Sequence, residues 1–138
     1  MSWVVDTCVV IDTLDDASVH SEASILLVNG MAQREGLLIC PMSFVELAPS
    51  FQGDIGLQRD FLDRIGVKWE QVFWTHEDTL CACAAWQRHV ADRRAGLVSR
   101  RPLADVLIGA FAMRHEGLIT RNPADFADIF PELVIRVP

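Results

Sequence analysis

Short apolar runs recur along the chain and alternate with longer stretches of helical periodicity. Five runs have the length and residue types of buried strands: Trp3-Val4-Val5, Leu37-Leu38-Ile39-Cys40, Val67-Lys68-Trp69, Leu118-Ile119-Thr120 and Leu133-Val134-Ile135. Helical stretches lie between most of these runs. This alternation predicts an α/β fold with a mainly parallel sheet.

Three longer segments have the pattern of amphipathic helices. Residues 21–34 carry apolar side chains at helical spacing and end near Gly36. Residues 77–94 begin with acidic and end with basic side chains, as the helix dipole favours. A third helix is expected to start near Pro102, since proline suits the first helical turn. The stretch 53–56 indicates only a turn, and we find no repeat or linker, so residues 1–138 are predicted to form a single domain.

Composition supports a packed core and argues against binding nucleic acid by bulk charge. The hydrophobic content is 51%, and twelve Lys and Arg against nineteen Asp and Glu give a net charge of −7. A polyanionic substrate must therefore meet a local basic patch or bound cations. The four cysteines show neither a C-x-x-C spacing nor a zinc pairing with histidine. We expect them to be reduced core thiols in a soluble cytoplasmic protein without a signal peptide or membrane span.

Four acidic residues stand just past the end of a predicted strand or in the first turn of a predicted helix. They are Asp6, Glu46, Asp105 and Asp125. Parallel strands end at the same edge of a sheet, so these carboxylates can converge in one crevice. Clustered carboxylates repel one another, and one or two hard divalent cations such as Mg²⁺ are the usual compensation.

Each carboxylate also has a structural explanation when it is taken alone. Ser43 and Glu46 have the spacing of a helix capping box. Asp105 would interact favourably with its helix dipole, and Asp125 could lie on a solvated helix face. Asp6 is harder to explain structurally, because it follows a buried strand directly.

Each of these four acids lies in a short sequence motif. The chain opens with Val-Asp-Thr-x-Val-x-Ile-Asp from Val5, continues with Ser-x-x-Glu-Leu and Arg-x-x-x-Asp-x-x-Ile, and carries Thr-Arg-Asn-x-x-Asp-Phe near its end. In this order, and across nearly the whole chain, they resemble the PIN-domain family, in particular the VapC ribonuclease toxins of VapBC toxin–antitoxin pairs.

The resemblance implies a PIN-like three-layer sandwich with a mainly parallel central sheet flanked by helices. It also implies an endoribonuclease that uses Mg²⁺ or Mn²⁺ to hydrolyse RNA phosphodiester bonds. Asp6, Glu46, Asp105 and Asp125 would be both the catalytic and the metal-binding residues, with Thr7 and Asn122 as polar support. Family members divide the fourth acid between the positions of Asn122 and Asp125, and we choose Asp125 for its charge. Cys8 departs from the Ser or Asn often found there, and a thiol hydrogen-bonds poorly.

The same resemblance implies a homodimer and a VapB-type antitoxin whose C-terminal segment lies in a groove. Our candidate for part of that groove is the helical stretch 43–64, whose Phe44, Phe51, Phe61 and Leu62 could equally be ordinary core. We expect most of the large aromatics at positions 69, 73, 74 and 86 to be buried. None of the four histidines stands in a recognisable acid–base or metal-ligand motif.

Two other functions remain to be weighed against the nuclease. The first is a catalytically weak or inactive PIN-fold module that acts through protein partners; the complete set of four acids argues against it. The second is a phosphatase of the haloacid dehalogenase type, which also places an Asp after its first strand. That family requires a second Asp two residues later, where this chain has Cys8.

Arginines before the third helix supply a candidate RNA-binding patch. Five of the twelve basic residues fall between positions 88 and 101, and Arg100 and Arg101 directly precede the Asp105 helix. The planar guanidinium suits bidentate phosphate contacts. We predict that reversing both charges weakens RNA binding and flattens its salt dependence, measured by filter binding across a salt series. An unchanged salt slope would contradict the assignment.

Overall fold

The computed structural model describes residues 2–138, which are built around a parallel sheet of five strands in the order β3-β2-β1-β4-β5. β1 (Ser2–Val5) is the central strand and pairs with β2 (Gly36–Leu38) on one side and β4 (Gly117–Ile119) on the other. β3 (Val67–Lys68) and β5 (Ile135–Arg136) form the two edges. All five apolar runs thus contribute to strands, and every strand pair is parallel.

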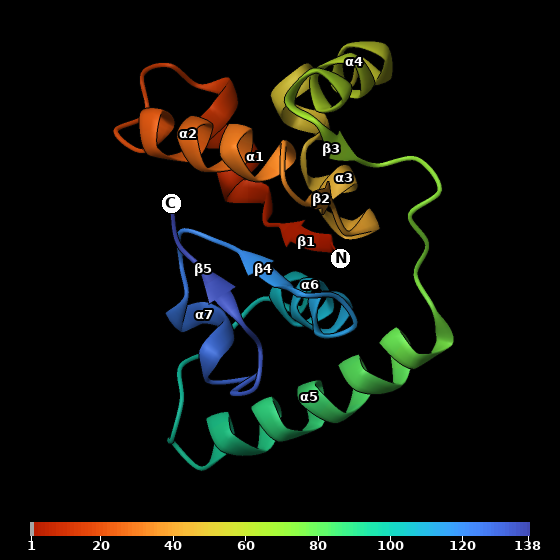
Figure 1. The fold of residues 1–138 in the computed structure, drawn as a ribbon. Helices are drawn as coiled ribbons and strands as arrows, with labels where there is room; N and C mark the ends of the chain where they lie inside the picture. The colour runs from red at the N-terminus through yellow and green to blue at the C-terminus, as the bar shows by residue number, and fades with distance from the viewer. Residues whose placement is uncertain (1) are drawn as a thin grey trace.

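Helices cover both faces of the sheet, and the predicted three-layer α/β sandwich is confirmed (Figure 1). Alternate strand residues point to opposite layers. Trp3 and Val5 belong to one buried cluster, whereas Val4 belongs to the other. The first cluster includes side chains of α1 (Thr7–Leu14), α2 (Ser21–Ala32) and α4 (Ile55–Ile65); the second includes those of α5 (His76–Arg94), α6 (Leu103–Met113) and α7 (Ala124–Ala127).

The capping-box interpretation of Ser43 and Glu46 is wrong. The short helix α3 spans Pro41–Glu46, so Ser43 lies inside it and is fully buried, while Glu46 is its last residue. Pro41 starts the helix one turn earlier than the Ser-x-x-Glu spacing suggested. A capping box does form at α5, between Thr75 and Asp78. Glu46 is therefore free of the backbone role that competed with a functional one.

The segment after α3 behaves mostly as core. A 3₁₀ turn, η1 (Ala48–Phe51), precedes α4, and Phe51 and Leu62 are both buried. Phe61 packs on Phe51 with ring centroids 5.7 Å apart. Of the large aromatics, Phe73 is exposed, and the tryptophans that follow β3 are only half-buried.

All four cysteines are free thiols, as expected, but only Cys40 is fully buried. Cys83 is exposed, so its placement in the core was a wrong prediction. Within residues 2–138, no helix has the length and apolar character that crossing a membrane requires.

The packing of α6 against the C-terminal segment can be tested at Gly109. A Cβ at this position would lie 2.3 Å from the buried Phe130 ring, whereas one at Gly30, on the exposed face of α2, would meet nothing within 4 Å. We predict that Gly109→Ala destabilises the protein by about 1–3 kcal/mol in urea unfolding. Gly30→Ala, the matched control, should be neutral or stabilising by up to about 1 kcal/mol. Equal effects of the two substitutions would contradict this packing.

Candidate acidic site

The four predicted acids come from four separate segments and face the carboxyl edge of the sheet. Asp6 follows β1 and caps α1, Glu46 ends α3, Asp105 lies in the first turn of α6, and Asp125 lies in α7 beyond β4. Burial, together with the charges of the other three acids, raises the pKa of Asp105 to about 6. The fold therefore brings the four carboxylates within electrostatic range of one another.

Asp6 is the most enclosed of the four, at 7% exposure. The Thr7 backbone N–H donates to its Oδ1 at 2.8 Å, and the Thr120 hydroxyl donates to its Oδ2 at 2.7 Å. Burial raises the pKa of Asp6, and these hydrogen bonds oppose that rise. Both carboxylate oxygens are thus held in fixed directions, one by the start of α1 and the other by the residue after β4.

Thr120 contacts Asp6 in the candidate site and was not singled out from the sequence, although it lies inside the Thr-Arg-Asn motif. It is fully buried directly after β4. Its hydroxyl accepts a hydrogen bond from the Asn122 backbone N–H at 3.1 Å, which leaves its proton for Asp6. Asn122 therefore supports the site through its main chain.

Thr7 joins two of the acids. Its backbone N–H binds Asp6, and its hydroxyl donates to Glu46 Oε1 at 2.8 Å. Thr7 therefore contacts Asp6 through its backbone amide and Glu46 through its hydroxyl.

Cys8 makes a polar contact with Asp6, although a thiol was expected to hydrogen-bond poorly at this position. Its thiol donates to Asp6 Oδ2 at 3.3 Å, and the Asn122 side-chain amide lies 3.8 Å from its sulfur. Burial, reinforced by the Asp6 charge, raises the pKa of Cys8 to about 11. Cys8 therefore remains a protonated thiol that can donate to the carboxylate at neutral pH.

Two arginines neutralise particular acids in this region. Arg121 pairs with Asp12 at 2.8 Å, and Asp12, at 3% exposure, also accepts from Ser18 and Ser24. Arg101, one of the two predicted RNA contacts, pairs with Asp125 at 3.1 Å. Arg100 is exposed.

Oxygen donors and excess negative charge fit a hard divalent cation. As the side chains stand, however, no three His, Cys, Asp or Glu residues among positions 2–138 form a group that could hold a metal ion. The four acids fit the charge and donor type of a magnesium site, and their side chains would have to draw together around the ion.

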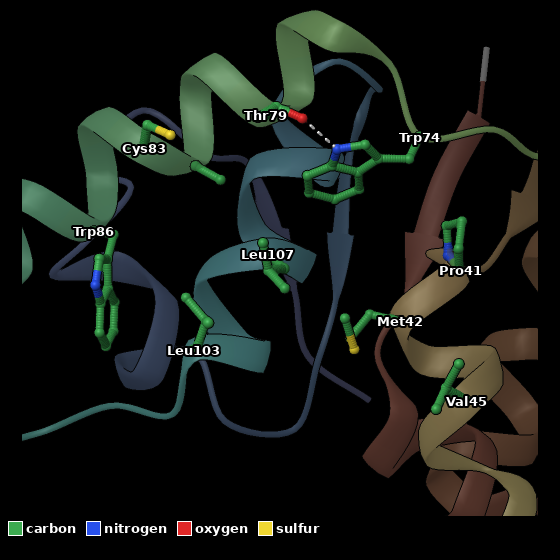
Figure 2. Close-up of a pocket in the computed structure, with 10 residues that line it drawn as sticks. Pro41, Met42, Val45, Trp74, Thr79, Cys83, Trp86, Leu103 and Leu107 are labelled. Carbon is green, nitrogen blue, oxygen red and sulfur yellow. Dashed lines mark hydrogen bonds between the residues drawn. The ribbon is translucent and has the colours of Figure 1, made fainter.

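An apolar groove of about 500 Å³ opens beside the acids, between α3, α5 and α6 (Figure 2). Its walls carry Pro41, Met42, Val45, Trp74, Thr79, Ala82, Cys83, Trp86, Leu103 and Leu107. Val45 directly precedes Glu46, and Leu103 and Leu107 flank Asp105 along α6. This groove is larger than the hollow of about 270 Å³ that Phe44 helps to line near α4. Of these two hollows, the larger is therefore lined mainly by α5 and α6, and the suggested stretch 43–64 contributes Val45 to it.

Comparison with solved structures identifies the same architecture. A chain of the VapBC2 complex from Rickettsia felis, crystallised with a DNA fragment from its promoter, superposes with a TM-score of 0.70. The alignment covers 99% of this chain and 98% of the other, at 15% sequence identity. The fold is VapC-like. No protein-family model matches the sequence, and no curated protein matches it either.

The raised pKa of Asp105 has a measurable consequence for stability. Its carboxyl binds a proton more tightly when folded, at about 6, than when unfolded, near 3.8. Asp105 therefore destabilises the folded state at neutral pH, and this cost disappears as the pH falls below 6 towards 4. In EDTA-containing buffer, Asp105→Asn should raise the urea midpoint more at pH 7.5 than at pH 4.5.

The exposed Asp60 on α4 provides the control, since Asp60→Asn removes one charge far from the cluster. It should change the midpoint similarly at both pH values. A pH-independent effect of Asp105→Asn would show that this carboxyl does not titrate as the structure indicates.

Proposed function

We propose that this protein is a metal-dependent endoribonuclease of the VapC toxin type. The observation that carries the proposal is the convergence of Asp6, Glu46, Asp105 and Asp125 from four separate segments, with too few cations to neutralise them. Hydrolysis would add water across one phosphorus–oxygen ester bond of RNA, which leaves a phosphomonoester on one product and a hydroxyl on the other.

The four acids would hold Mg²⁺ or Mn²⁺. When bound, such an ion lowers the pKa of water and screens the phosphate charge. Thr120 and the Thr7 amide would keep the two oxygens of Asp6 in fixed directions, and the Thr7 hydroxyl would do the same for Glu46. The residues other than the acids therefore pre-orient the ligands, which reduces the reorganisation needed when the ion binds.

RNA would approach over the loop before α6. Arg100 is exposed there and could contact a phosphate, while Arg101, in the same loop, is paired with Asp125. With a net charge of −7, the protein depends on this local patch and on the bound cation to accept a polyanion.

We further propose a VapB-type antitoxin as partner and a homodimer as the assembly. The apolar groove fits a segment with apolar anchors, and its α3 rim ends at Glu46, an acid that favours a basic side chain on that segment. The R. felis complex contains both components of a VapBC pair, which supports this kind of partner. A cation of the partner at the acids would compete with the metal.

The alternative is a catalytically weak or inactive module of the same fold. The Arg101–Asp125 ion pair and the absence of an assembled metal-binding group among residues 2–138 favour it. The hydrogen bonds that orient Asp6 and Glu46 favour the nuclease, because a module that acts only through partners has no use for pre-oriented carboxylates.

Cleavage of total RNA separates the two functions. Wild type, Asp6→Ala and Asp105→Asn are incubated with RNA in Mg²⁺ or Mn²⁺ and in EDTA, with Asp60→Asn as the charge-matched control. We expect cleavage by wild type and Asp60→Asn in the presence of metal, and a loss of at least a hundredfold in the two site variants. Equal activity of all four proteins would refute the mechanism.

A further inference from the structure

The loop between α5 and α6 is bonded back to α5 by Arg101, just before α6 begins. It leaves α5 through Gly96, whose φ of +76° suits glycine, and reaches α6 at Pro102. The Arg101 backbone N–H donates to His89 Nε2 at 3.0 Å. This bond fixes the main chain of Arg101 against the helix behind it.

His89 is well placed to act as a rigid anchor. It lies on α5 with 3% exposure, and its ring packs on Trp86 with centroids 5.8 Å apart. Because Nε2 accepts a hydrogen bond, it carries no proton, and the neutral ring holds its proton on Nδ1. A buried ring on a long helix cannot easily follow a loop that moves away.

The guanidinium of Arg101 extends from this anchor to the acidic site. It contacts Asp125 at 3.1 Å and Asp128 at 4.0 Å, and only 24% of its side chain is exposed. The Arg101 charge also opposes part of the rise in the pKa of Asp105 that burial and the other acids cause. Arg101 thus supplies positive charge at the position where a metal ion would need the oxygens of Asp125.

We infer that His89 is a positioning residue that holds Arg101 as a resident counter-ion of the acidic cluster, in competition with a divalent cation for Asp125. The inference rests on the proposed function, because the competing cation belongs to it. The positive charge of Arg101 offsets part of the negative charge of the acids that a metal ion would otherwise offset. A metal therefore binds with reduced affinity until the guanidinium leaves Asp125.

Mn²⁺ binding measured by electron paramagnetic resonance, without RNA, tests the competition. Arg101→Gln should bind Mn²⁺ about three- to fivefold more tightly than wild type, as expected for loss of one partly exposed ion pair. His89→Phe, which removes the acceptor, should shift the affinity in the same direction. His89→Gln, whose Oε1 can accept the Arg101 N–H, should stay close to wild type. Arg100→Gln is the control for charge alone and should have a smaller effect than Arg101→Gln.

Nuclear magnetic resonance tests the anchor without metal. The Arg101 amide should exchange slowly in wild type and His89→Gln and rapidly in His89→Phe, with a parallel change in the Arg101 side-chain Nε–H signal. A protonated Nε2 in the wild-type histidine ¹⁵N spectrum would overturn the anchor even if His89→Phe fails to fold. So would equal behaviour of the Gln and Phe variants.

The two proposals fail in different ways. Absence of RNA cleavage together with the expected Mn²⁺ shifts would refute the nuclease and leave the competition intact. Absence of Mn²⁺ binding in every variant would refute the metal site and the competition, and the Arg101 signals would still decide whether His89 positions that arginine.

Discussion

The buried carboxylate of Asp6 is the constraint around which the site is built. A carboxylate at 7% exposure needs hydrogen bonds to its oxygens, and it receives them from Thr7, Thr120 and Cys8. Thr7 and Cys8 directly follow Asp6 in the chain, whereas Thr120 reaches it because β1 lies beside β4, with the Asp6 N–H bonded to the Ile119 carbonyl at 2.9 Å. The pairing of two strands more than a hundred residues apart therefore creates the environment of this acid.

Positive charge is distributed unevenly among the neighbouring acids. Asp12 is buried and is satisfied by Arg121 and two serines, as expected of a structural ion pair. Asp105 instead has its pKa raised by burial and by the charges of the three other acids. Asp125 has a basic partner as Asp12 does, but this partner, Arg101, lies in a loop.

The groove shares two helices with two of the four acids. Val45 and Glu46 are neighbours on α3, and Leu103 and Asp105 lie in the first turn of α6. A partner seated on the apolar walls would therefore contact the same two helices that carry Glu46 and Asp105. A basic side chain of such a partner and Arg101 of this chain would both act on the negative charge of the acidic cluster.

Local pattern in the sequence determined the strands, the long helices and the four acids, because apolar runs and the residues that follow them report burial and chain direction directly. It failed at Ser43, where Pro41 starts the helix earlier than the Ser-x-x-Glu spacing suggested. Only the tertiary structure showed the contacts of Thr120, Cys8, His89 and Arg101, which mostly join segments distant in sequence. Residue types and spacing fix which side chains can bond, whereas the packing of strands and helices decides which of them meet.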